Sequence, residues 1–77
     1  MLKVIDVDYC GGYTLKLKFN DGVSKIVDLA PYLTGEVFEE LRDPEKFIQY
    51  GLTRVTIEWV NGADLAPEFL YEIGVAA

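Results

Sequence analysis

Two copies of the tetrapeptide Asp-Leu-Ala-Pro place carboxylates at comparable points of the chain, Asp28 in the first copy and Asp64 in the second. Paired carboxylates can act as general acid and base, or hold a divalent cation through their oxygens. Glu58 and Glu68 flank the second copy and would extend such a set. The chain has no histidine and one cysteine, Cys10, so no second type of ligand or base accompanies these carboxylates.

The same tetrapeptides also have a structural interpretation. Each one ends a stretch of alternating residues and begins a helical turn with a proline, Pro31 or Pro67, whose missing N–H would be unpaired in a first turn anyway. The aspartate two residues before the alanine could accept a hydrogen bond there, and its charge suits the positive end of the turn. We favour this interpretation, and we expect no catalytic residue and no cofactor.

The elements that would position these residues follow from the hydrophobic periodicity. Apolar residues alternate with polar ones over residues 3–9, 13–19 and 23–29, which is typical of half-buried strands. The pattern predicts a three-stranded antiparallel meander with strand 13–19 in the centre. An edge left open at 3–9 or 23–29 could pair across a homodimer.

The two loops of the meander are predicted from strand register, because a slip of one residue moves every side chain to the other face. Three-residue loops ending in glycine, Cys-Gly-Gly and Asn-Asp-Gly, keep apolar residues opposite each other. They place Tyr9 opposite Tyr13 and Phe19 opposite Val23, with Ile5 facing the core.

The middle of the chain changes to helical spacing. Residues 36–50 carry apolar side chains three and four positions apart, and Asp43-Pro44 is a helix start. Because a residue before proline avoids helical angles, this segment is predicted to be two short helical pieces, the second ended by Gly51.

The last third is predicted to be a β-hairpin and a short helix. Asn61-Gly62 by itself favours a two-residue turn, but alternation over residues 52–59 and 63–65 favours a three-residue loop that places Trp59 opposite Ala63, and we prefer the latter. Pro67 then starts a helical turn or two. The order β-β-β-α-β-β-α makes residues 1–77 one small α+β domain with its helical pieces on one face of the sheet.

The charge distribution points to a basic partner. The net charge is −6, and the ten acids and three bases of residues 28–77 give that part −7. An acidic surface repels phosphates and attracts cations, so a bound nucleic acid is disfavoured and a small basic protein is the expected partner. Exposed aromatics and carboxylates near the helical segments are the candidate contacts: Tyr32, Glu36, Glu39, Glu40 and Tyr71.

Three functions stay open at this point. The first is a non-enzymatic protein-interaction module. The second is a nucleic-acid-associated regulator that binds through a sheet face bearing Lys16 and Lys18, although Asp6 and Asp8 lie beside them. The third is a binder of a small ligand or divalent metal that uses Glu58 and Asp64.

The setting is expected to be cytoplasmic. A lone cysteine forms no internal disulfide, the N-terminus carries no hydrophobic leader, and the apolar runs are too short to span a membrane.

Three segments carry a family resemblance: "LKLKFNDGVSKIVDLAPYL", "VFEELRDPEKF" and above all "IEWVNGADLAPEFLYE". Through them essentially the whole chain resembles the small prokaryotic family known as domain of unknown function 2442. The family has no established catalytic residue. The matching motif positions, which we interpret as a turn, a core anchor and a helix start, are Trp59, Asn61, Gly62, Asp64, Pro67, Glu68 and Tyr71.

The resemblance also implies a genetic context. Members are short bacterial proteins, some fused to a helix-turn-helix domain. They often lie beside another small gene, a layout suggestive of a toxin–antitoxin pair. This chain has no room for a helix-turn-helix after its last strand, so an antitoxin role would depend on protein contact.

Overall fold

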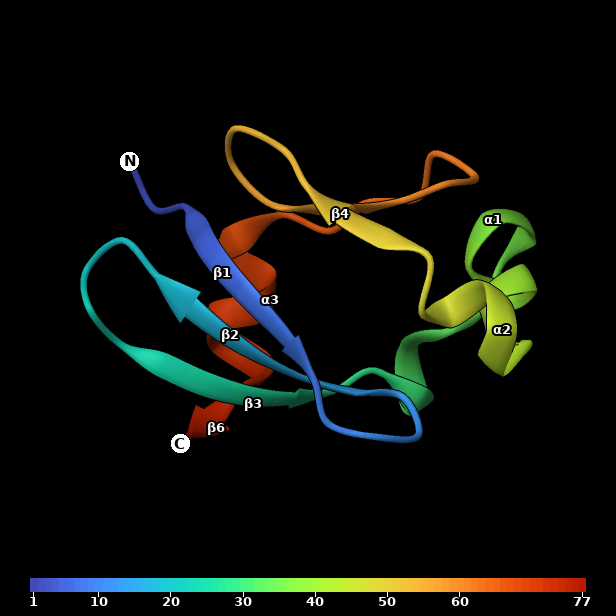
Figure 1. The fold of residues 1–77 in the computed structure, drawn as a ribbon, viewed down its shortest axis with the longest axis horizontal. Helices are drawn as coiled ribbons and strands as arrows, with labels where there is room; N and C mark the ends of the chain where they lie inside the picture. The colour runs from blue at the N-terminus through green and yellow to red at the C-terminus, as the bar shows by residue number, and fades with distance from the viewer.

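A computed structural model describes all 77 residues of the chain. It contains six strands, three α-helices and two 3-10 turns (Figure 1). Their bounds, in chain order, are β1 (Val4–Tyr9), β2 (Thr14–Phe19), β3 (Ser24–Asp28), η1 (Ala30–Tyr32), α1 (Glu36–Glu39), η2 (Glu40–Arg42), α2 (Pro44–Phe47), β4 (Tyr50–Leu52), β5 (Ile57–Trp59), α3 (Pro67–Ile73) and β6 (Val75–Ala76).

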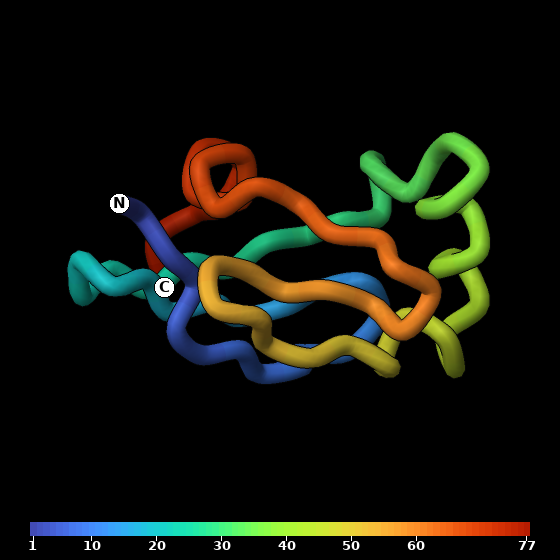
Figure 2. Tube along the Cα trace, turned by 90° about the horizontal axis from the view of Figure 1, so that it is seen from above, coloured from blue at the N-terminus to red at the C-terminus, as the bar shows by residue number.

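The predicted α+β class is confirmed. Strands β1, β2, β3 and β6 form an antiparallel sheet in that order, and β4 and β5 form a separate hairpin. Helix α3 lies against one face of the larger sheet, while α1, η2 and α2 gather at one end of the molecule (Figures 1 and 2). Thirteen buried hydrophobic residues form one core cluster between these layers.

The hairpin of β2 and β3 has the predicted register. Leu15 pairs with Val27, and the N–H of Phe19 donates to the carbonyl of Val23 at 2.8 Å. Gly22 closes the three-residue loop with a φ of 89°, in the left-handed region that glycine adopts most readily.

The predicted register of the first hairpin is wrong by two residues. Tyr9 pairs with Leu15 rather than Tyr13, and the loop spans residues 10–13. Tyr13 does not pair with β1, because its side chain is held elsewhere. Its ring packs edge-on against Phe47, with centroids 5.2 Å apart, and its hydroxyl donates to the carbonyl of Arg42. A slip of two residues keeps every side chain on its face.

Strand β1 contains a bulge at Ile5, which overturns the prediction that Ile5 faces the core. The register shifts between Val4 and Asp6, so Val4 is buried whereas Ile5 is 49% exposed. Asp6 also accepts a hydrogen bond from the backbone N–H of Val7 at 3.0 Å. The N–H of Val4 donates to the carbonyl of Val55 at 2.9 Å, which ties the start of this edge strand to the β4–β5 hairpin.

The other predicted open edge, at residues 23–29, is partly covered. Val75 and Ala76 of β6 pair with Ile26 and Lys25 of β3, a strand that the alternation did not reveal. The chain can return along β3 because Gly74 lies against Lys25, where an added Cβ would lie 2.8 Å from the Lys25 Cβ.

The middle segment consists of short helical pieces, as predicted. Asp43 has extended angles, and its side chain accepts from the N–H of Glu45 at 3.0 Å, which caps α2. However, α2 ends at Phe47, and Gly51 lies in β4 rather than at a helix end.

The predicted strand 52–59 is therefore interrupted. Thr53 and Thr56 close a turn through N–H and hydroxyl bonds to the Thr56 carbonyl, at 2.8 and 3.0 Å, and only β5 continues as strand. The following three-residue loop is confirmed: the Trp59 N–H donates to the Ala63 carbonyl at 2.8 Å, and Gly62 has a φ of 90°. Beyond it, pairing is reduced to a single bridge between Glu58 and Asp64.

Candidate functional site

An acidic surface covers the end of the molecule formed by α1, η2 and α2. We call it the acidic end and define it by its five exposed carboxylates: Glu36, Glu39, Glu40, Asp43 and Glu45. The two bases nearby are already engaged. Arg42 Nε donates to the Leu33 carbonyl at 2.9 Å, and Lys46 Nζ lies 3.8 Å from Glu40 Oε1. With these bases included, residues 36–46 carry a net charge of −3.

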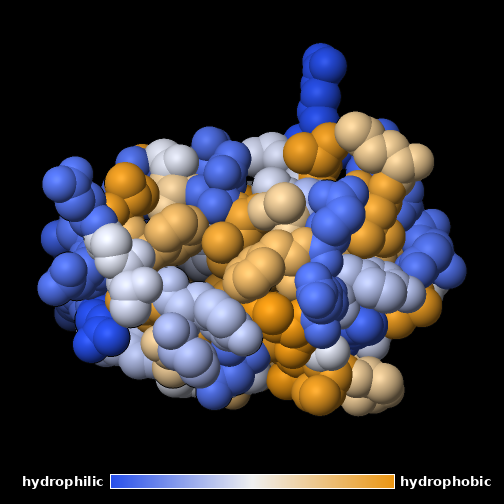
Figure 3. Space-filling model, turned by 180° about the vertical axis from the view of Figure 1, so that it is seen from behind, coloured by the Kyte–Doolittle hydropathy of each residue, from blue (hydrophilic) through white to orange (hydrophobic).

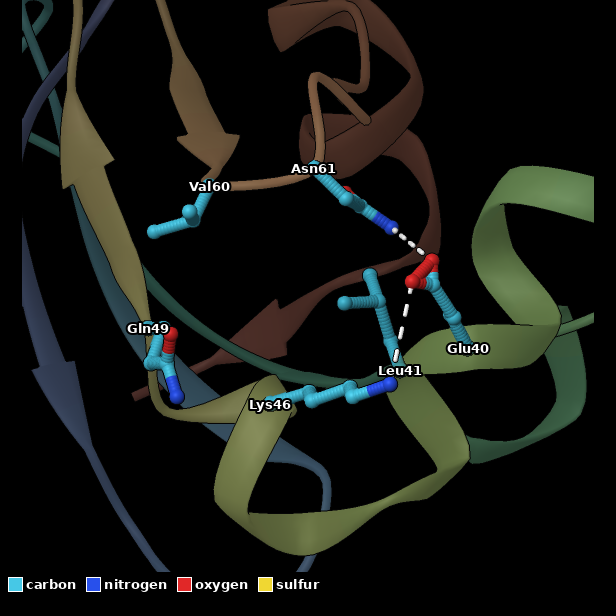
Figure 4. A pocket seen from close by; sticks show the side chains of 6 residues that line it. All are labelled: Glu40, Leu41, Lys46, Gln49, Val60 and Asn61. Atoms are coloured by element: carbon cyan, nitrogen blue, oxygen red, sulfur yellow. Dashed lines mark hydrogen bonds and ion pairs between the residues drawn. The ribbon is translucent and has the colours of Figure 1, made fainter.

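A pocket of about 200 Å³ opens beside the acidic end (Figure 4). Helical pieces η2 and α2 form one side of it, and the turn after β5 forms the other. Its lining combines one carboxylate, one ammonium, two amides and two aliphatic side chains: Glu40, Leu41, Lys46, Gln49, Val60 and Asn61.

Asn61 joins the turn after β5 to the acidic end. Its Nδ2 donates to the Val37 carbonyl at 3.0 Å and lies 3.5 Å from Glu40 Oε2, while its Oδ1 accepts from the Ala63 N–H at 3.1 Å. From sequence, Asn61 was interpreted only as a turn residue. No local signal reveals the link to α1, because Val37 and Glu40 lie more than twenty positions away.

Trp59 anchors the core beneath this pocket. It is buried, and its indole N–H donates to the Phe47 carbonyl at 2.7 Å. Its ring lies 5.8 Å from Phe47 and 6.4 Å from Phe38, measured between centroids. The core role favoured for Trp59 is confirmed.

The two Asp-Leu-Ala-Pro segments are joints before helical turns, as favoured, but their aspartates behave differently. Asp28 accepts a hydrogen bond from the Ala30 N–H at 3.0 Å, as predicted. Asp64 makes no such bond, and α3 begins at Pro67 after the N-cap residue Ala66 with no side-chain cap, so the predicted cap is wrong there. Pro67 is buried at the first position of α3, which agrees with its predicted helix-start role.

The carboxylates proposed for metal binding lie on the surface. Glu58 and Asp64 face each other across the single bridge, and Glu68 is exposed in the first turn of α3. No group of three or more potential metal ligands occurs in the structure.

The two lysines proposed for nucleic-acid binding face aspartates of the neighbouring strand. Lys16 pairs with Asp8 and Lys18 with Asp6, around a shallow polar hollow of about 140 Å³. Opposite charges at cross-strand positions offset each other, so this face provides no concentrated positive potential.

The two tyrosines predicted as partner contacts, Tyr32 and Tyr71, have different neighbours in the fold. Tyr32 is 39% exposed and packs edge-on against Phe69, with centroids 5.2 Å apart. Tyr71 is half-buried near the β2–β3 loop, where its hydroxyl donates to Asp21 Oδ2 at 2.9 Å. Lys25 Nζ lies 3.9 Å above the Tyr71 ring and donates to the Tyr71 carbonyl at 2.5 Å. Tyr71 is thus engaged within the fold, away from the acidic end.

The contact between Tyr71 and Asp21 predicts a pH dependence of stability. The N–H of Val23, aided by the Tyr71 hydroxyl, holds the pKa of the Asp21 carboxyl below its usual range. A lowered folded-state pKa adds stability above the unfolded pKa, and this stability is lost as pH falls through the folded value. Asp21→Asn should therefore lower the melting temperature at pH 6, and the difference from the parent should vanish near pH 2.

The matched control for this titration is Glu72→Gln, which removes one exposed carboxylate from α3. We expect it to leave the melting temperature nearly unchanged at both pH values. An Asp21→Asn deficit of equal size at pH 6 and pH 2 would show that packing, and not ionisation, is responsible.

No helix in the structure combines the length and apolar character that crossing a membrane requires. Hydrophobic residues gather over the middle of the back face, which α3 crosses, whereas the margin formed by α1 and α2 is hydrophilic (Figure 3). The acidic end is therefore a polar margin of the molecule with local apolar positions.

Comparison with known proteins places the chain in a family. No curated protein and no solved structure matches it. The sequence profile described as a protein of unknown function (DUF2442) matches residues 4–76. This range includes every strand and helix described above and the whole Trp59–Tyr71 motif. The chain belongs to the DUF2442 family.

Proposed function

We propose that this protein is a non-enzymatic protein-interaction module whose acidic end binds a small basic protein. Such a pair would have the antitoxin-like arrangement that the family resemblance implies, in which an acidic domain meets a basic partner. The observation that carries the proposal is the concentration of five exposed carboxylates on one end, with its two bases held by neighbouring groups.

Exposed aliphatic residues lie in the segments next to these carboxylates and support a protein partner. Val37, Ile48 and Val60 are 45%, 51% and 80% exposed. The backbone places them together: the Val60 N–H donates to the Gln49 carbonyl at 3.0 Å, next to Ile48, and Asn61 bonds to the Val37 carbonyl. Protein interfaces combine such apolar contacts with a charged rim.

The charge of this end would speed the encounter. Steering by a field of one sign raises association rates by about ten-fold to a thousand-fold, and salt screens it. We expect a tagged pull-down from the source cells to recover one small basic protein in stoichiometric amount at low salt. Raising the salt should lower its association rate by at least about ten-fold.

A variant of the acidic end tests the location. Glu36→Gln, Glu39→Gln and Glu45→Gln together remove three charges outside the pocket, and we expect a slower association and a weaker salt dependence. The matched control removes three exposed carboxylates elsewhere, at Glu58, Glu68 and Glu72, with the same change in net charge.

The control variant should capture the partner as the parent protein does. Equal effects of the two triple variants would mean that total charge, rather than the acidic end, drives binding. Recovery of this chain alone, at every salt concentration, would contradict the proposal.

A further inference from the structure

The pocket beside the acidic end has the dimensions of a site for one side chain. Sites for drug-sized ligands measure roughly 300–1,000 Å³, whereas this one holds about 200 Å³. Its lining is also divided: Val60, which is 80% exposed, supplies most of the aliphatic surface beside nearly buried Leu41, and Glu40 supplies a carboxylate. This division suits a long side chain that has an apolar stem and a charged head.

The carboxylate of Glu40 retains capacity for a further cation. Its Oε1 lies 3.8 Å from Lys46 Nζ, and its Oε2 lies 3.5 Å from Asn61 Nδ2. Both contacts are longer than the 2.7–2.9 Å typical of a charge-assisted N–H···O bond. The side chains of Glu40 and Lys46 remain about half exposed, so an incoming group can reach the carboxylate.

The position of the Lys46 ammonium indicates that the pocket favours a positive charge. Its ammonium approaches Glu40 across the mouth of the pocket, while Leu41 projects from η2 into the space between them and Val60 (Figure 4). The other carboxylates of the acidic end are exposed nearby and keep the local potential negative. An anion is therefore disfavoured at this position.

We propose that the pocket receives an arginine side chain of the basic partner, which replaces Lys46 at Glu40. The aliphatic stem packs against Leu41 and Val60, and the planar guanidinium donates two parallel hydrogen bonds to the carboxylate. Arginine suits this geometry better than lysine, because its donors form a rigid fork that matches a carboxylate. The identity of the partner rests on the function proposed above, whereas the chemistry of the pocket does not.

Three side-chain amides give a direct measurement. Gln49 and Asn61 line the pocket, and Asn20, the only other asparagine or glutamine in the chain, lies elsewhere, bonded to Met1 and Lys3. We would titrate N-acetylarginine N-methylamide and follow these amides by NMR. The Gln49 and Asn61 signals should shift in a saturable way, with a Kd on the order of millimolar, while Asn20 stays in place. The neutral citrulline analogue should cause no shift.

Two variants test the roles of the charged groups. Glu40→Gln should abolish the shifts, whereas Glu36→Gln, an equal charge change outside the pocket, should preserve them. Lys46→Met removes the competing ammonium and should tighten binding, by at most about five-fold for an exposed pair. The indole N–H signal of buried Trp59 reports whether each variant is folded.

The inference is overturned if citrulline shifts the same amides, or if folded Glu40→Gln still binds the arginine probe. Both results leave the proposed function standing, because the triple variant that tests it lies outside the pocket. The opposite result is also distinguishable. If the pull-down recovers no basic partner but the arginine probe still binds and needs Glu40, the proposed function is overturned and the pocket remains an arginine site.

Discussion

Replacing Trp59 by alanine is expected to remove a large part of the free energy of unfolding of the chain. Truncating a buried tryptophan lowers the free energy of unfolding by about 3–5 kcal/mol. For a chain of 77 residues, the usual stability per residue gives a total free energy of unfolding of roughly 4–12 kcal/mol. Trp59 is buried between Phe38 and Phe47, so its loss also removes both ring contacts. Chemical denaturation followed by circular dichroism would measure the change.

Trp59→Phe separates packing from hydrogen bonding at the same position. Phenylalanine keeps an aromatic ring between the neighbours but leaves the Phe47 carbonyl without the indole N–H, which lies at 2.7 Å. A buried acceptor left unpaired typically lowers stability by about 1–3 kcal/mol. The variant should therefore fold, with an intermediate midpoint. Stability equal to that of the parent would mean that the indole bond contributes nothing.

Gly74→Ala is expected to produce the second large effect. The new Cβ would lie 2.8 Å from Lys25 Cβ, closer than real contacts allow, and would make a tight 3.0 Å contact with the Leu70 carbonyl oxygen. Either β6 separates from β3, or Lys25 moves and loses its bond to the Tyr71 carbonyl. Overpacking of this kind lowers the free energy of unfolding by about 1–3 kcal/mol. Denaturation would measure the loss, and amide exchange along β3 would locate it.

Gly51→Ala is the matched control, since it adds the same methyl group at a glycine in strand β4. No atom lies within 4 Å of its added Cβ, and its backbone does not need glycine. We expect its free energy of unfolding to stay within about 0.5 kcal/mol of the parent. Equal effects of the two substitutions would show that the contact with Lys25 does not restrain the fold.

Register could be predicted where apolar alternation decides the loop length, even after Trp59, where Asn61-Gly62 by itself favours a two-residue turn. Gly22 and Gly62 each end a three-residue loop, and apolar alternation on both sides excludes a slip of one residue. The β2–β3 ladder and the loop after Trp59 follow from these local signals. The proline at the start of α3 is equally local, because Pro67 needs no partner to fix its backbone angle.

The remaining errors come from tertiary contacts. A shift of two residues leaves alternation unchanged, so the pattern could not distinguish Tyr13 from Leu15 as the partner of Tyr9. The bulge at Ile5 flips one side chain without any glycine to mark it. Strand β6 has only two residues, too few for a periodic pattern.

The candidate site was predicted in part. The carboxylates of the acidic end could be predicted from charge alone, and Glu40 was among them. The pocket could not, because it forms only where η2 and α2 meet the turn that carries Val60 and Asn61. The separation of Tyr71 from these residues could not be predicted either, since its bond to Asp21 depends on how α3 packs on the sheet.

The irregular strand β1 also affects the tendency of the protein to aggregate at high concentration. A long, flat edge strand is a template on which other chains stack into fibrils. Here the bulge at Ile5 bends that edge, Asp6 occupies the N–H of Val7, and Asp8 adds a second charge. The opposite edge is formed by two-residue β6. Both edges of the sheet are therefore poor templates for the stacking of further chains into cross-β fibrils.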